Sequence, residues 1–134
     1  MLHRVIAIGR WVIDFLFAPV RYDREAVFAC LYELEAPRFI LRRAWKIMED
    51  DEPNKGFTYS NSRMRRAVVV IGPTTDSGEF LNTFTHELRH LADAIAKSIG
   101  YKLDSEGPAY LTGEAAMALA TTICELGCPC HHNR

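Results

Sequence analysis

The stretch Thr85-His86-Glu87-Leu88-Arg89-His90 decides how the rest of this 134-residue chain is interpreted. It contains an HExxH pattern inside a segment whose apolar residues recur at helical spacing. Residues four apart lie on one side of a helix, one turn from each other, so His86 and His90 can direct two imidazoles to one point. A zinc ion can occupy that point, and Glu87, about 100° further around the axis, can reach a water on the metal.

Histidines can also be core or surface residues with no ligand. On a helical wheel with His86 at zero, however, the apolar residues of this segment fall on the opposite side, between roughly 140° and 220°. These residues are Leu81, Phe84, Leu88, Leu91 and Ile95. Polar residues share the histidine side, namely Asn82, Asp93 and Lys97. The motif therefore lies on the polar face of an amphipathic helix, which indicates a metal site.

Composition bounds the class of protein. The length suits one domain with a real core, and 49% hydrophobic and 25% charged residues are typical of a soluble globular chain. The formal net charge of −1 argues against a nucleic-acid partner and says nothing of the oligomeric state. Arg10 and Asp14 interrupt the apolar N-terminus, so we expect no signal peptide, no membrane partner and a cytoplasmic location. Cys30 is expected to be a small buried apolar residue.

Turn residues and hydrophobic periodicity place the first half of the chain. Gly9-Arg10 predicts the turn of a β-hairpin, and Asp23 is a suitable N-cap for the first helix. Pro37 fits the first turn of the second helix. The expected strands are Arg4–Ile8, Trp11–Phe17, Phe57–Ser60 and Ala67–Ile71, and the expected helices are Arg24–Glu35 and Pro37–Glu49.

The second half is expected to be helical. Asp76 followed by Glu79 predicts the start of the motif helix, which would run over 77–99 and end at Gly100. A last helix is expected over 106–126, with Pro108 in its first turn. The chain is thus expected to be one domain over 1–134, with scaffold strands and helices in 1–75, metal-site helices in 76–126 and a Cys/His-rich tail in 127–134.

Two histidines do not hold a catalytic zinc alone, because such sites use three protein ligands and a water. Glu106 and Glu114 both follow the motif helix and are candidates for the third ligand. Asp93 and Ala96 stand where the metzincin pattern HExxHxxGxxH needs Gly and His, which excludes that branch. The segment Glu106-Gly107-Pro108-Ala109-Tyr110 resembles the element that opens the second zinc helix in several gluzincins, and this favours Glu106.

The region from Phe84 to about Gly113 therefore resembles the core of a zincin-like metallopeptidase of the gluzincin type. The closest resemblance is to small HExxH proteins encoded by phages and mobile elements. It implies an α+β, zincin-like fold: a small antiparallel or mixed sheet of about four strands, scaffold helices, the HExxH helix and a following C-terminal helix. It also implies that the strand Ala67–Ile71 is the edge strand along which an extended substrate lies.

The resemblance assigns roles residue by residue. His86, His90 and Glu106 would bind Zn²⁺, and Glu87 would be the general base that takes a proton from the water and passes it to the leaving amine. Asp93 would hold a ligand imidazole through a hydrogen bond, or would be a solvated helix carboxylate. Tyr59 and Tyr110 are weak candidates for stabilising the oxyanion, and packing is the favoured interpretation of both.

A dense Cys/His cluster closes the chain. Cys124, Cys128, Cys130 and His131, with His132 beside them, can hold a second metal ion, since thiolates and imidazoles at short spacing bind soft metals. A disulfide is an alternative in an oxidising compartment. A third interpretation is an unstructured tail with free thiols.

Three functions remain to be compared. The first is a zinc-dependent metallopeptidase that hydrolyses peptide bonds in a peptide or protein substrate. The second is a non-catalytic, zinc-stabilised binding or regulatory module of a phage or mobile element. The third is a nucleic-acid-binding module using Arg63, Arg65 and Arg66, which the near-neutral charge makes the weakest of the three.

Overall fold

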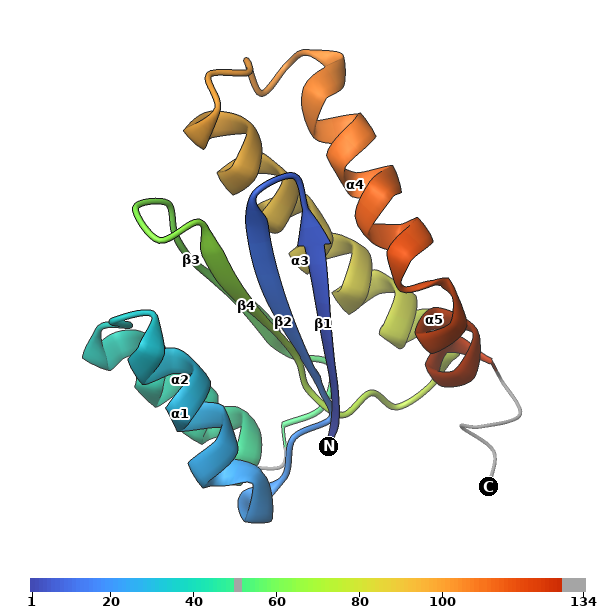
Figure 1. The fold of residues 1–134 in the computed structure, drawn as a ribbon. Coiled ribbons are helices and arrows are strands. Elements are labelled where there is room, and N and C mark those ends of the chain that lie inside the picture. Colours follow the sequence, from blue (N-terminus) through green and yellow to red (C-terminus); the bar gives the residue numbers. More distant parts are fainter. Residues whose placement is uncertain (50–51, 129–134) are drawn as a thin grey trace.

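The computed structural model describes residues 1–49 and 52–128, and in that part of the chain it shows an α+β fold with a four-stranded mixed sheet and five α-helices (Figure 1). The strands are β1 Leu2–Ile8, β2 Trp11–Phe17, β3 Gly56–Asn61 and β4 Arg66–Ile71. The helices are α1 Arg24–Glu33, α2 Arg38–Glu49, α3 Ser77–Ser98, α4 Glu106–Ala118 and α5 Ala120–Gly127, with a 3₁₀ turn at Arg21–Asp23.

The strand order is β1-β2-β4-β3. β1 pairs with β2 and β3 pairs with β4 as antiparallel neighbours, while β2 and β4 are parallel. The expectation that Ala67–Ile71 forms the edge strand is therefore wrong, because β4 is paired on both sides. Its run of apolar residues is buried at every position from Ala67 to Ile71, as is typical of a strand covered on both faces. The edges are β1 and β3.

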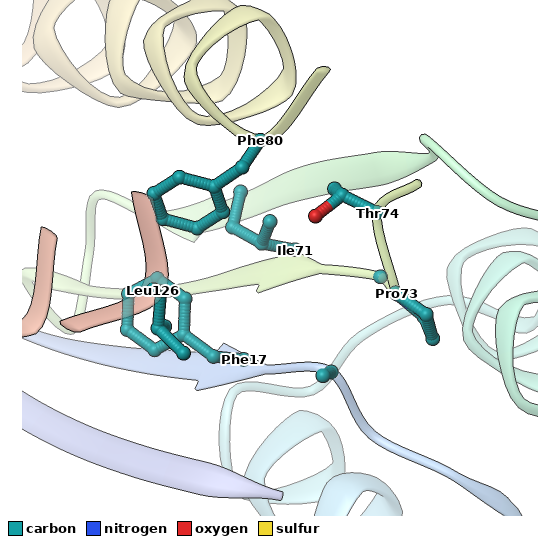
Figure 2. A pocket seen from close by; sticks show the side chains of 8 residues that line it. Phe17, Ile71, Pro73, Thr74, Phe80 and Leu126 are labelled. Carbon is teal, nitrogen blue, oxygen red and sulfur yellow. The ribbon is translucent and has the colours of Figure 1, made fainter. Parts of the chain in front are cut away.

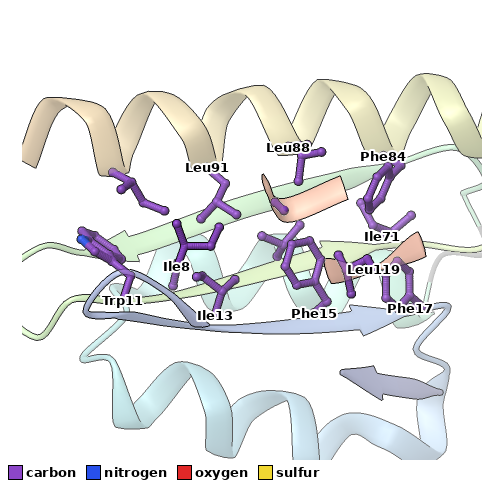
Figure 3. Packing of buried hydrophobic residues seen from close by; sticks show 14 of the residues in the cluster. Ile8, Trp11, Ile13, Phe15, Phe17, Ile71, Phe84, Leu88, Leu91 and Leu119 are labelled. Atoms are coloured by element: carbon purple, nitrogen blue, oxygen red, sulfur yellow. The ribbon is translucent and has the colours of Figure 1, made fainter. Parts of the chain in front are cut away.

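Helices cover both faces of this sheet. α1 and α2 pack on one face, and α3, α4 and α5 lie on the other (Figure 1). Figure 3 shows Phe84, Leu88 and Leu91 pointing from α3 onto the sheet. The core beneath α3 also contains Ile8, Trp11, Ile13, Phe15, Phe17, Ile71 and Leu119. The apolar stripe expected on the motif helix is confirmed except at Leu81, which is 45% exposed.

Local capping fixes the ends of α3. The Asp76 carboxylate accepts a hydrogen bond from the backbone N–H of Glu79 at 2.8 Å, which confirms the expected helix start. Gly100 follows the helix with φ of +83°, a conformation that favours glycine. α1 begins after Asp23 as expected, but the Asp23 carboxylate accepts from the N–H of Val20 rather than from α1.

The single C-terminal helix expected over 106–126 is divided in two. Leu119 leaves the helical conformation, with φ of −105° and ψ of 13°, and is 2% exposed in the core beneath α3. After this break α5 turns toward the start of α3, where Gly127 approaches the Phe80 ring. No helix within 1–49 and 52–128 has the length and apolar run needed to cross a membrane.

Candidate metal centre

His86 and His90 lie on the exposed face of α3, away from the core. Their Nε2 atoms are 3.1 Å apart, and the two rings meet at 78° with centroids 4.7 Å apart. Two Zn–N bonds of about 2.05 Å at the tetrahedral angle would separate the two nitrogens by about 3.3 Å. The imidazoles therefore already point to one place at nearly the spacing that zinc requires, so the donor pair fits this metal.

A cavity of ≈ 360 Å³ opens beside the two imidazoles. It is bounded by α3, by β3 and by one side chain of α2; its lining residues are Arg43, Gly56, Thr58, Ser60, His86, Glu87, His90 and Ala94. A neighbouring cavity of ≈ 220 Å³ shares Gly56, His86 and Glu87 and is completed by Asn54, Lys55, Asn82 and Thr83. The histidine pair thus lies at the edge of a polar hollow between α3 and the edge strand β3.

Glu87 occupies the side of α3 that faces β3 and is only 5% exposed. The Thr58 hydroxyl lies 3.1 Å from Glu87 Oε1 and 3.1 Å from the Glu87 backbone oxygen, so it can donate to either acceptor. A buried carboxylate needs such a partner, because its desolvation is costly when it is left unbonded. Thr58 therefore holds the Glu87 carboxylate in the cavity that contains both histidines.

Gly56 allows β3 to approach α3 at this point. A Cβ on Gly56 would lie 2.6 Å from the Val70 backbone oxygen, 3.1 Å from Thr83 Cγ2 and 3.2 Å from Glu87 Cγ. The first of these contacts is with backbone, which cannot move aside easily. The start of β3 is also tied to the loop before α3, since Thr75 N–H donates to Asn54 Oδ1 at 3.1 Å.

Arg43 reaches the same cavity from α2. Its Nη2 lies 3.5 Å from the Gly56 backbone oxygen, and its Cζ lies 5.7 Å from the centre of the Phe57 ring. Sequence reasoning missed Arg43, Gly56 and Thr58. The small residues of β3 at 56, 58 and 60 share one face by strand alternation, and this pattern was the available signal for a cavity beside the motif helix.

The structure does not bring Glu106 or Glu114 to the histidines. Glu106 is exposed at the start of α4, in a hollow that also contains Ile99 and Tyr101 at the far end of α3. Ile99 lies nine residues after His90, or about 13 Å along the helix. Glu114 lines hollows with Ile99 and the β1–β2 turn. Neither glutamate is among the described residues that line the histidine cavity.

The expected supporting residues also lie elsewhere. The Asp93 carboxylate accepts from Arg89 Nε at 2.8 Å, so it is engaged by a guanidinium rather than by an imidazole. The Tyr59 hydroxyl donates to backbone oxygens at 34 and 35 on the opposite face of the sheet, 3.3 and 3.4 Å away. Tyr110 is 75% exposed on α4. None of the three lines the histidine cavity.

A second group of potential ligands lies on the other face of the sheet. Among the described residues, only His3, Asp14 and Cys30 place three such ligand atoms within 4.8 Å of one another. Asp14 is nevertheless already bonded, with His3 Nε2 at 2.7 Å and Arg66 Nη2 at 3.2 Å. Burial, followed by the charges of Asp14 and Glu33, raises the pKa of the Cys30 thiol and disfavours the thiolate that a metal requires.

The C-terminal cluster lies only partly within the described residues. Cys124 is exposed on α5, and Cys128 follows the end of that helix. Cys130, His131 and His132 lie outside the described residues, so the second metal site and its alternatives remain predictions.

The basic turn between β3 and β4 is partly neutralised within the chain. Arg63 Nη2 lies 2.8 Å from a Glu35 carboxylate oxygen, and Arg66 pairs with Glu33 as well as with Asp14. Arg65, the last residue of the turn before β4, is exposed.

A separate cavity of ≈ 230 Å³ lies between the ends of β2 and β4, the start of α3 and α5 (Figure 2). The residues that line it are mainly apolar, and Figure 2 labels Phe17, Ile71, Pro73, Thr74, Phe80 and Leu126. No ionisable residue is among the described residues lining it, so its chemistry differs from that of the histidine cavity.

No protein-family model, curated protein or solved structure matches the chain.

Proposed function

We propose that the protein is a zinc-dependent, zincin-like metallopeptidase, related in kind to the small HExxH proteins of phages and mobile elements. One observation carries the proposal: the Nε2 atoms of His86 and His90 meet at 3.1 Å beside a cavity in which Glu87 is held by Thr58. Two converging nitrogen donors with a carboxylate close by are what metal-assisted hydrolysis requires.

A zinc ion in this site would lower the pKa of a water toward neutrality and polarise a carbonyl group. Glu87 would accept the proton of the attacking water and return it to the leaving amine. Thr58 would keep the carboxylate turned into the cavity. No strand of residues 1–49 or 52–128 pairs with the outer edge of β3, and an extended peptide can pair with such an edge. We therefore assign pairing with an extended substrate to β3, in place of the expected strand Ala67–Ile71.

The exposure of the site favours catalysis over a purely structural zinc. Structural zinc sites use four protein ligands and are closed, whereas catalytic sites keep a position open for water. Both histidines are exposed and border a cavity. The third protein ligand remains to be assigned, since the structure places Glu106 and Glu114 away from the histidine cavity. Zinc titration of Glu106→Gln and Glu114→Gln tests both glutamates directly.

Substitution of the proposed base is the test of the function. The zinc-loaded protein is incubated with a mixture of unstructured peptides, and new termini are identified by mass spectrometry. In Glu87→Gln, cleavage should fall by a factor of about 10² to 10⁴, the usual contribution of a general base. Zinc affinity should stay the same, because Glu87 is not a proposed ligand. Glu79→Gln, on the same helix but not lining the cavity, is the matched control. Full cleavage by zinc-loaded Glu87→Gln would refute the mechanism.

A non-catalytic zinc-stabilised module is the second candidate. Its basis is that His86 and His90 are the only two metal ligands that the described residues bring together on α3, whereas a catalytic zinc uses three protein ligands. In such a module the metal contributes directly to the free energy of unfolding. Equal unfolding temperatures with and without a chelator would eliminate this candidate, whereas a large drop with no detectable cleavage would favour it.

A further inference from the structure

Arg43 places a guanidinium in the cavity of the histidine pair. It extends from α2 across the edge of β3, where its contacts are one long hydrogen bond to the Gly56 backbone oxygen and the face of the Phe57 ring. Neither partner carries a charge, and no carboxylate of the described residues forms an ion pair with it. A guanidinium has five donors, so most of its bonding capacity is left for a ligand.

The charges around the site are unbalanced. Arg43 lines the larger cavity and Lys55 lines the adjoining one, and Glu87 is the only acidic residue among the described residues lining either. The Asp93 carboxylate lines neither cavity and is engaged by Arg89. A divalent metal at the histidines would increase the positive excess. A ligand that carries a negative charge would reduce it.

We infer that Arg43 determines substrate specificity, and that the protein acts on acidic peptides with an Asp or Glu side chain beside the cleaved bond. This inference rests on the proposed function. A peptide extended along β3 would present alternate side chains to the cavity. A guanidinium binds a carboxylate through two parallel hydrogen bonds, which a neutral amide of the same shape cannot match.

Two other roles of Arg43 make different predictions. If its role were to stabilise the oxyanion, its loss would slow cleavage of all peptides alike and would not change discrimination between acidic and neutral side chains. If it only packed on Phe57, its loss would affect stability and leave ligand preference unchanged. A binding measurement with paired ligands separates the specificity role from both of the others.

The experiment uses two peptide hydroxamates that differ only in a Glu or Gln side chain next to the hydroxamate. The hydroxamate reports on the metal, and the side chain reports on Arg43. Calorimetric titration of the zinc-loaded protein should show about tenfold tighter binding of the Glu ligand, or about 1.4 kcal/mol. Arg43→Gln should remove this difference, Arg43→Lys should keep part of it, and higher salt should reduce it. Arg42→Gln, an exposed neighbour that does not line the cavity, should retain it.

Each result has one meaning. If both ligands bind wild-type protein equally, in a zinc-dependent way, the specificity inference is wrong while the metal site stands. The same holds if Arg43→Gln weakens both ligands by one common factor. If neither ligand binds zinc-loaded protein, the proposed zinc site fails and the inference fails with it.

Discussion

Histidine and carboxylate side chains lie close together at two places in this molecule. The two places differ in how much of the hydrogen-bonding capacity of these side chains is already used. On one face of the sheet, His3, Asp14 and Cys30 place three ligand atoms within 4.8 Å of one another. On α3, His86 and His90 bring two nitrogens to 3.1 Å beside Glu87. Judged by the number of nearby donors alone, the first cluster would be the better metal site.

Bonding capacity reverses that order. Both oxygens of Asp14 are already occupied, one by His3 and the other by the Arg66 guanidinium, which also repels a cation. Within the described part of the chain, by contrast, the two imidazoles on α3 bond only to each other, and the Glu87 carboxylate bonds to the Thr58 hydroxyl. Ligand residues form a site when their bonding capacity is unused, and proximity alone does not ensure this.

The largest difference should appear in metal binding. Removing one imidazole leaves a single nitrogen on α3, so His90→Ala should abolish zinc binding as measured by calorimetry and by the metal content of the dialysed protein. His3→Ala is the matched control and should bind zinc like the wild type. Loss of zinc from His3→Ala together with zinc binding by His90→Ala would contradict the assignment of the metal site to α3.

A second difference should appear in stability. Asp14→Ala removes a buried partner of Arg66, whose Nε is buried with no hydrogen-bond partner among the described residues. We expect a loss of about 3 kcal/mol in the free energy of unfolding, as for other broken buried pairs. Asp93→Ala breaks a more exposed pair one turn apart on α3 and should cost only about 0.5 kcal/mol. Urea denaturation of both variants measures this, and equal losses would contradict it.

The features of this fold that could be predicted from sequence are those that depend on residues close together in the chain. Asp76 and Gly100 mark the ends of α3 because capping depends on residues within one turn. The apolar stripe of α3 and the polar position of its histidines follow from the same helical period. Four strands near their observed positions followed from β-branched and aromatic runs bounded by turn residues.

Non-local placement could not be predicted in the same way. No sequence pattern near residues 67–71 predicts that β2 pairs with β4 and that β3 lies at the edge, because strand order is set by packing over the whole chain. The position of Glu106 depends likewise on where α4 crosses α3. Arg43 and Thr58 reach the site from elements that contain no motif, and only the fold brings them to Glu87.

The smallest expected effect concerns Cys30. Burial, then the negative charges of Asp14 and Glu33, raise the pKa of its thiol above the usual range, with Arg66 opposing. Iodoacetamide at pH 8 should therefore modify Cys30 more slowly than the exposed Cys124, as followed by peptide mass spectrometry. Cys124→Ser confirms which peptide reacts first.

The raised pKa also has a consequence for stability. In the unfolded chain this thiol loses its proton near pH 8.5, while the folded protein still retains it. The associated stability is thus fully present below that pH and is lost as the pH rises through the folded pKa of Cys30. Wild type should lose more stability between pH 8 and 10 than Cys30→Ala in parallel urea denaturations. Equal losses would mean that folding does not raise the pKa of Cys30.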